Sequence, residues 1–320
     1  MTNKTLTDFE KQIAELEKLI DNLKQKALDT GVNTSEALEE LQKKRDDLLK
    51  EFFSNLDAWD NAILARHQKR PYTLDYVRNI FDEFIELHGD RLFADDHAMV
   101  CGIGNIEDKQ VAFIGQQKGR DLKERQYRNF GSAKPEGYRK AMRVMHLAEK
   151  FHKPIVCFVD TPAADCSVGA EERGISEAIA RNMMDMMSLK VPVIAIVIGE
   201  GGSGGAIGIA VANKVAMLEH SIYSVIPPEG CAAILWRDPS KAKEAATALK
   251  INAESAKELG VIDDIIKESL GGAHRNADET AENIKEYILK CIEELSPKTG
   301  DELAKERYDK FRNFGKYIEN

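Results

Sequence analysis

The stretch Val191–Ala206 reads Val-Pro-Val-Ile-Ala-Ile-Val-Ile-Gly-Glu-Gly-Gly-Ser-Gly-Gly-Ala. Its first half, Val191–Ile198, is a β-branched run typical of a parallel strand buried on both faces. Its second half is rich in glycine, so the backbone there can approach another group closely or take a positive φ. Small apolar residues at 206–212 predict that a helix follows. A strand, a glycine turn and a helix N-terminus together favour a cluster of backbone N–H groups suited to an oxyanion or a phosphate.

Three interpretations of this turn are open. The first is a tight strand-to-helix corner without a ligand. The second is a nucleophile elbow, because Gly201–Gly205 matches G-x-S-x-G and makes Ser203 a candidate nucleophile. Asp263 or Asp264, followed by His274, stand in the chain order that such a serine hydrolase needs. In the third interpretation the backbone N–H groups are the catalytic device, and Ser203 is only a small residue that fits.

The composition is that of a soluble globular protein, with 31% charged and 43% hydrophobic residues. A net charge of −9 argues against a general nucleic-acid-binding protein. The N-terminus is too charged for a signal peptide, and the longest apolar runs, about eight or nine residues, are too short to cross a membrane. The five cysteines are scattered without a C-x-x-C pair. This pattern favours a cytoplasmic protein without a zinc site.

Residues 6–50 are predicted to form two helices. Apolar residues repeat at heptad-like spacing in the first helix, at Phe9, Ile13, Leu16, Ile20 and Leu23. A break at Gly31 separates it from a second stripe, at Leu38, Leu41, Leu48 and Phe52. The pattern predicts a helical hairpin, which either packs on its own domain or docks on a partner. Both possibilities remain open from the sequence.

A buried strand is also predicted at Pro154–Asp160, followed by a loop to Gly169 and a helix over 170–189. This helix connects to the Val191 strand as a β-α-β crossover. The loops 161–169 and 199–205 should therefore lie at the same edge of the sheet and form a cleft. Further strands are expected at 98–106, 110–116, 214–219 and 221–226, and further helices at 136–151, 227–236, 240–249, 278–295 and 300–318.

The strongest charge feature is the stretch 118–143, in which nine basic residues face three acidic ones. A basic concentration inside an acidic chain favours an anionic partner such as phosphates. The alternative is a solvated face.

Many motifs, taken together, resemble the alpha subunit of bacterial acetyl-CoA carboxylase carboxyltransferases, from about Leu56 to Glu294. These motifs are Arg70–Tyr76, Glu86–Arg91, Ile114–Arg120, Arg128–Gly131, Pro135–Ala141, Ala170–Gly174, Gly199–Ala206, Tyr223–Ile226 and Gly271–His274. The resemblance implies an α/β fold with a crotonase-like (ClpP/crotonase) domain at residues 55–295. The helical hairpin would occupy 1–54 and a charged C-terminal helix 296–320. Residues 253–263 are similar to a helix-turn-strand of the wider crotonase superfamily.

The resemblance implies that the chain works with a beta subunit in an α2β2 assembly. The beta subunit would carry a zinc ribbon. Together they would transfer a carboxyl group from carboxybiotin, held on a biotin carboxyl carrier protein, to acetyl-CoA. The product would be malonyl-CoA, in the first committed step of fatty acid synthesis. No cofactor would be bound covalently, because the chain has neither a biotinyl-lysine motif nor an ATP-binding loop. The carrier and the biotin carboxylase would be other chains.

Site residues follow from the same resemblance. The backbone N–H groups of Gly204 and Gly205 would hold an oxyanion, and those of Ala163 and Ala164 would face them. Substrate would also contact the remaining turn and basic residues Gly201, Gly202, Ser203, Lys118, Gly119 and Arg120. The last three would bind phosphates of CoA. No residue is expected to hold a metal, and Ser203 would be a scaffold residue rather than a nucleophile.

One loop departs from the family pattern. The family usually reads D-T-P-G-A-Y-P-G, whereas Asp160–Ser167 reads Asp-Thr-Pro-Ala-Ala-Asp-Cys-Ser. If the family glycines take positive φ, Ala163 or Ser167 would cost on the order of 1 kcal/mol or force a new path. Asp165 would also bring a carboxylate towards an anionic transition state. A catalytically impaired subunit with an altered loop 163–167 is therefore an alternative, beside the serine hydrolase.

Overall fold

The β-branched runs of the sequence form the centre of one mixed sheet. The computed structural model describes residues 5–315; the ends of the predicted hairpin and C-terminal helix, 1–4 and 316–320, lie outside the described residues. Within that range eight strands pair in the order β1-β2-β3-β4-β5-β6-β8, and β7 pairs with β5. The strands are β1 (Glu83–Glu86), β2 (Met99–Ile106), β3 (Lys109–Gln116), β4 (Ile155–Thr161), β5 (Val193–Gly202), β6 (Lys214–Leu218), β7 (Ile222–Ser224) and β8 (Asp264–Ile266).

The pairing changes from antiparallel to parallel across the sheet. β1, β2 and β3 pair antiparallel, and every pair from β3 onward is parallel. All of β4 is buried, as is β5 up to Gly201, which confirms the two strands predicted to be covered on both faces. Because β4 and β5 are parallel neighbours, the loops that follow them leave the same edge of the sheet.

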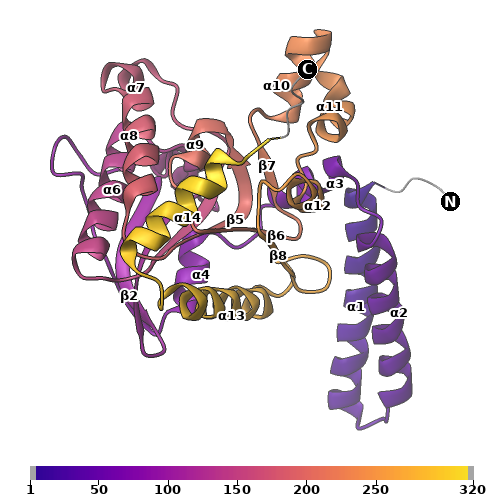
Figure 1. The fold of residues 1–320 in the computed structure, drawn as a ribbon. Helices are drawn as coiled ribbons and strands as arrows, with labels where there is room; N and C mark the ends of the chain where they lie inside the picture. Colours follow the sequence, from indigo (N-terminus) through magenta and orange to yellow (C-terminus); the bar gives the residue numbers. More distant parts are fainter. Residues whose placement is uncertain (1–4, 316–320) are drawn as a thin grey trace.

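Helices cover both faces of the sheet (Figure 1). The apolar sides of α6 and α8 pack into one core, and those of α4 and α13 into another across the sheet. The helices are α1 (Leu6–Thr30), α2 (Ser35–Phe53), α3 (Ala58–Ala65), α4 (Thr73–Ile80), α5 (Leu122–Tyr127), α6 (Pro135–Lys150), α7 (Val168–Glu172), α8 (Ile175–Ser188), α9 (Ser203–Ile207), α10 (Pro228–Trp236), α11 (Ala242–Leu249), α12 (Ala253–Glu258), α13 (Ala277–Leu295) and α14 (Gly300–Arg312). No helix in the described range is long and apolar enough to cross a membrane.

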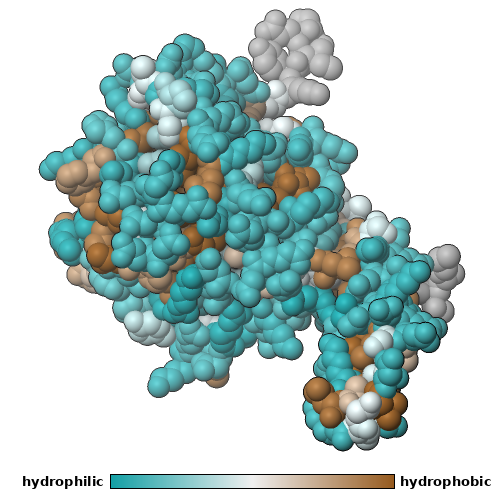
Figure 2. Space-filling view, turned by 90° about the horizontal axis from the view of Figure 1, so that it is seen from below, coloured by the Kyte–Doolittle hydropathy of each residue, from teal (hydrophilic) through white to brown (hydrophobic). Residues whose placement is uncertain are grey.

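The predicted helical hairpin is present as α1 and α2, and it projects away from the sheet (Figure 1). Near its base the rings of Phe9 and Phe52 stack with centroids 3.9 Å apart. Apolar side chains towards its far end remain exposed, Leu28 by 80% and Val32 by 56%. Figure 2 shows hydrophobic side chains on this projecting hairpin. Within this chain the hairpin therefore packs mainly on itself.

Three predicted elements differ from the structure. The helix expected over 206–212 is the short α9, which begins at Ser203 and ends at Ile207. The helix expected over 170–189 is broken into α7 and α8, because Gly174 takes a φ of 77° between them. The C-terminal helix expected to reach 318 ends at Arg312. It is held firmly despite its many charges, because the fully buried Arg307 donates to the carbonyl oxygens of Met186 and Leu189 at 2.7 and 2.9 Å. These carbonyls lie at the C-terminal end of α8, where the last carbonyls of a helix lack their regular intrahelical donors; that of Met186 receives only a long bond of 3.4 Å from the Leu189 N–H.

Candidate active site

The glycines at the end of β5 allow close contact with the loop that follows β4. A Cβ added to Gly202 would lie 2.0 Å from the carbonyl oxygen of Pro162. One added to Gly205 would lie 2.6 Å from the backbone nitrogen of Ala164. The predicted glycine turn is shorter than expected, since β5 continues through Gly202 and Ser203 alone turns the chain, with a φ of 49°. Gly202 and Gly205 are therefore needed because a side chain there would collide with the facing loop. The residue in the left-handed conformation is Ser203, not a glycine.

Gly204 and Gly205 lie in the first turn of α9, where backbone N–H groups have no acceptor within the helix. The two differ in their surroundings. A Cβ on Gly204 would meet nothing closer than Ile179 Cδ1 at 3.5 Å, whereas Gly205 is packed under Ala163 and Ala164. The carbonyl oxygen of Gly205 points into the protein and accepts hydrogen bonds there. Its direction fixes the adjoining peptide groups of the turn.

The facing loop carries two more backbone donors. Within residues 5–315 the N–H groups of Ala163 and Ala164 have no hydrogen-bond acceptor, although the carbonyl of Ala163 accepts from the Thr161 hydroxyl at 2.7 Å. Neither Ala163 nor Ser167 takes a positive φ, so the strain considered for this altered loop is absent. The structure thus brings all four predicted donors, at 163, 164, 204 and 205, to one junction.

Asp165 is turned into the loop itself. Its carboxylate accepts from the backbone N–H of Ser167 at 2.9 Å and from the Ser167 hydroxyl at 3.2 Å. Ser167 in turn caps α7 by accepting from the N–H of Ala170. The carboxylate thereby stabilises the start of α7.

Ser203 lacks the partners of a nucleophile. Its side chain is exposed and makes no hydrogen bond to the described residues. Asp263 and Asp264 accept hydrogen bonds from a backbone N–H of β6 and a tyrosine hydroxyl of α13. His274 lies against the hairpin, with Nε2 3.5 Å from a carboxylate oxygen of Glu10. The positive φ at Ser203 resembles that of a nucleophile elbow, but no triad forms around it.

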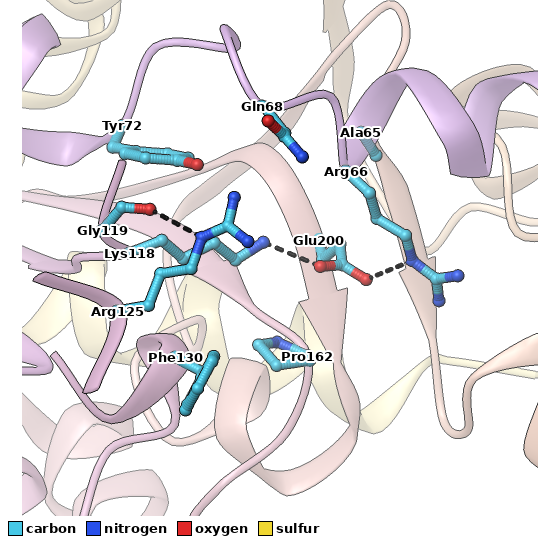
Figure 3. Close-up of a pocket in the computed structure, with 10 residues that line it drawn as sticks. All are labelled: Ala65, Arg66, Gln68, Tyr72, Lys118, Gly119, Arg125, Phe130, Pro162 and Glu200. Carbon is cyan, nitrogen blue, oxygen red and sulfur yellow. Dashed lines mark hydrogen bonds and ion pairs between the residues drawn. The ribbon is translucent and has the colours of Figure 1, made fainter. Parts of the chain in front are cut away.

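Beside the turn lies a cavity of about 230 Å³ (Figure 3). Its lining residues come from five separate segments: Ala65, Arg66, Gln68, Tyr72, Lys118, Gly119, Arg125, Phe130, Pro162 and Glu200. Pro162 directly precedes Ala163 in the loop after β4, and Glu200 lies near the end of β5, so the cavity is lined by neighbours in sequence of the proposed donors. Sequence reasoning anticipated Lys118 and Gly119 here but missed Arg66, Arg125 and Glu200. Two of them could have been suspected from the sequence, because Glu200 lies within the glycine-rich stretch and Arg125 within the basic stretch.

Lys118 joins the ends of β4 and β5. Its Nζ lies 2.8 Å from Asp160 Oδ1 and 2.7 Å from Glu200 Oε2 (Figure 3). Burial by itself would lower the pKa of Lys118, but the two carboxylates raise it above its usual value. Burial opposes ionisation of Glu200 as well, yet Lys118 and Arg66 hold its pKa below the usual value. These opposite charges neutralise one another at the floor of the cavity.

Arg120 also has partners within the chain. Its guanidinium pairs with Asp75, lies 4.1 Å from the ring centroid of Tyr72 and donates to the carbonyl of Arg70 at 2.7 Å. Arg125 differs: it projects into the cavity, donates only to the carbonyl of Gly119, and has no acidic partner among residues 5–315. Of these two arginines, Arg125 offers the cavity the less neutralised charge.

Much of the remaining basic stretch is neutralised at a distance. Lys140 pairs with Asp95 at 2.5 Å and Arg139 with Asp90 at 2.9 Å. Arg143 donates to the carbonyl of Gly89. The acidic partners Asp90 and Asp95 lie 49 and 45 residues before Arg139 and Lys140 and outside the stretch, so local charge counting overstated the net charge of this surface.

One group of three possible metal ligands converges in the described range: Glu10, His67 and His274, with ligand atoms within 4.8 Å of one another. The Nδ1 of His67 accepts from the backbone N–H of Lys69 at 3.2 Å. The neutral ring therefore carries its proton on Nε2, which faces Glu10 at 3.7 Å. This is the arrangement of an imidazole–carboxylate contact, and it joins α1 to the main body of the protein.

Comparison with known proteins gives a consistent result. Residues 6–315 match the family described as acetyl co-enzyme A carboxylase carboxyltransferase-like. The acetyl-coenzyme A carboxylase carboxyl transferase subunit alpha of Staphylococcus aureus strain MRSA252 is 52% identical over 314 residues, which are 98% of this chain and 100% of that protein.

The solved structures that resemble this chain share its fold. Transcarboxylase 12S matches with a TM-score of 0.58 and 17% identity, over 73% of this chain and 44% of its own. The beta subunit of Pseudomonas aeruginosa geranyl-CoA carboxylase matches with a TM-score of 0.55 and 16% identity, over 74% and 45%. This chain thus spans less than half of each, and at these identities the likeness concerns the fold alone, which is crotonase-like. On the evidence of its sequence over residues 6–315, the chain belongs to the family of acetyl-CoA carboxylase carboxyltransferase alpha subunits.

Proposed function

We propose that this alpha subunit, joined to a beta subunit, transfers a carboxyl group from carboxybiotin to acetyl-CoA and releases malonyl-CoA. One observation carries the proposal. Gly205 packs directly against Ala163 and Ala164, the cavity of about 230 Å³ is lined by the neighbouring Pro162 and Glu200, and no nucleophilic triad forms around Ser203 among residues 5–315. Such an arrangement suits a reaction that develops negative charge on oxygen and needs no covalent bond to the enzyme.

The proposed role of this chain is electrostatic. Carboxyl transfer to a thioester places negative charge on the thioester oxygen and on the ureido oxygen of biotin in turn. When bound, carboxybiotin supplies the carboxyl group and the base for the methyl proton. The N–H groups of Gly204 and Gly205 hold one developing oxyanion, since their direction is set before the substrate arrives. The absence of a Cβ at Gly205 keeps the two loops close together.

The cavity would receive the anionic or ureido part of a substrate. Lys118, Gly119 and Arg120 were expected to bind phosphates of CoA, and we retain them as proposed substrate contacts. Because Lys118 and Arg120 are already paired with carboxylates, we add Arg125, which has no acidic partner among residues 5–315. Salt should weaken such a contact more than it weakens the buried pairs.

The proposed setting is a cytoplasmic α2β2 assembly that works with a biotin carboxyl carrier protein and a biotin carboxylase. In that setting the reaction supplies malonyl-CoA for fatty acid synthesis. No cofactor would be bound covalently to this chain, because biotin would be carried by the carrier protein and ATP used by the biotin carboxylase.

Co-expression with the beta subunit tests the proposal. The purified complex should form malonyl-CoA from acetyl-CoA and carboxybiotin, and the alpha subunit alone should form none, because the site lies between subunits. Turnover by the alpha subunit alone would contradict the assignment. An intact complex without turnover would instead show that the altered loop 163–167 has impaired catalysis.

A further inference from the structure

The side chain of Gln116, at the end of β3, lies between the two loops of the candidate site. It is fully buried. Its Oε1 accepts from the backbone N–H of Asp160 at 3.0 Å, and its Nε2 donates to the carbonyl oxygen of Gly205 at 3.0 Å. One amide group thus ties the end of β4 to the first turn of α9.

The orientation of this amide is determined by its partners. An N–H group needs an acceptor and a carbonyl needs a donor, so only one of the two amide orientations satisfies both contacts. The backbone of Gln116 is held as well, since the Thr73 hydroxyl donates to its carbonyl at 2.5 Å. The carbonyl of Gly205 receives a second hydrogen bond, from the Tyr138 hydroxyl at 3.2 Å. The contact is therefore part of a rigid, fully buried arrangement.

The backbone donors of the site have no side chains that could aim them. The direction of the Gly205 N–H follows the orientation of the peptide groups in the turn, and the loop containing Ala163 and Ala164 begins after Thr161, the residue that follows Asp160 and ends β4. Of the side chains in the described range, that of Gln116 bonds to both segments. The Tyr138 hydroxyl contacts the turn but not the end of β4, and the Lys118 ammonium contacts carboxylates rather than the turn.

We propose that Gln116 is a positioning residue, which sets the distance and the relative orientation of the two groups of backbone donors. The inference rests on the proposed carboxyl transfer at this junction. It does not make Gln116 a catalytic residue, because its side chain contacts only the protein. Loss of the bridge should lower kcat more than it changes KM, since the donors act mainly on charge that develops in the transition state.

Gln116→Glu is the sharpest test, because the introduced carboxyl group keeps the shape of the amide. In its protonated form it can accept from Asp160 N–H and donate to the Gly205 carbonyl; in its ionised form it cannot donate. Burial should raise the pKa of this carboxyl group. In the alpha–beta complex, kcat relative to wild type should therefore fall as pH rises, by at least about tenfold between pH 6 and pH 9.

Two further variants complete the test. Gln116→Met keeps the volume and removes both hydrogen bonds, so its kcat should be low at every pH. Gln117→Glu is the matched control: Gln117 is also buried, and its side chain binds Leu74 N–H and the Lys118 carbonyl instead of the two loops. It should lose stability to a similar degree without the same pH-dependent fall in kcat.

Amide hydrogen exchange gives a readout apart from activity. In the Gln116 variants, but not in the Gln117 control, peptides covering 161–167 and 199–209 should exchange faster. If the wild-type complex makes no malonyl-CoA, the proposed function fails. The hydrogen-exchange measurement then tests by itself whether the Gln116 side chain holds the two segments together. If wild type is active and Gln116→Glu keeps a constant kcat ratio across the pH range, or both variants exchange like wild type, the positioning role is overturned.

Discussion

The loops after β4 and β5 come together at the candidate site, where the two backbones lie very close to each other. The two loops accommodate this close approach in opposite ways. The β5 side has no side chains at Gly202 and Gly205, where a Cβ would collide with the other backbone. The β4 side carries side chains at Ala163 and Ala164, with ordinary backbone angles. A close approach of two backbones thus needs glycine on one side only. This is why a loop that departs from the family pattern can still face the glycine turn without strain.

The largest effect should come from removing the charge that joins the two loops. Lys118→Met leaves Asp160 and Glu200 buried and close together without their shared cation. Breaking such a buried arrangement costs about 3–5 kcal/mol. Urea denaturation of the isolated alpha subunit measures it, and Lys123→Met, at an exposed position, is the control. A loss below about 1 kcal/mol would show that the carboxylates take up protons or water at little cost.

The second-largest effect should come from disturbing the close contact between Gly205 and the loop after β4. Gly205→Val should force the loops apart and tilt the donor, and loss of one such donor costs about 2.7–4 kcal/mol, roughly a hundred- to thousand-fold in kcat. Gly204→Ala is the matched comparison, because a Cβ there has 3.5 Å of clearance. Its effect on kcat should be much smaller. Equal losses in both variants would mean that space at Gly205 is not the deciding factor.

The β4 loop should tolerate more change. We expect Ala163→Gly, Asp165→Tyr, Cys166→Pro and Ser167→Gly, made together, to preserve or raise turnover with acetyl-CoA. Because glycine is itself tolerated at an N-cap, loss of the Ser167 cap on α7 should cost only about 0.3 kcal/mol of stability. Thermal unfolding and a malonyl-CoA assay separate the two effects. If turnover disappears while the fold persists, the native loop has a role of its own, and acyl-CoA substrates of other sizes should be assayed.

The smallest effect is expected at Ser203. Ser203→Ala removes an exposed hydroxyl without a partner, so kcat should stay within about twofold, far from the loss that follows removal of a nucleophile. Labelling with a fluorophosphonate probe provides a second readout, and none is expected. Abolished activity in Ser203→Ala together with an active Gly205→Val would reverse the assignment of roles in this turn.

Several features of the fold were predictable from local pattern. The β-branched runs at 154–160 and 191–198 indicated buried parallel strands because few other structures accommodate them. The heptad-like spacing of apolar residues in the first fifty residues indicated the hairpin, because this spacing places the apolar side chains on one face of each helix. The resemblance to the family also led to the proposal of Ala163, Ala164, Gly204 and Gly205 as backbone donors. The contacts that surround these residues were not predictable from the motifs.

What the sequence determined by itself was the order of the strands along the chain, the concentration of glycine at one strand end and the family of the chain, because periodicity and motifs are local properties. The tertiary structure decided which side of the junction needs its glycines, that Ser203 carries the positive φ, and that Gln116 and Lys118 join the two loops. It also decided that much of the basic stretch is neutralised by carboxylates such as Asp90 and Asp95. Each of these depends on contacts between residues tens of positions apart, and their distances are set only when the sheet brings the strand ends together.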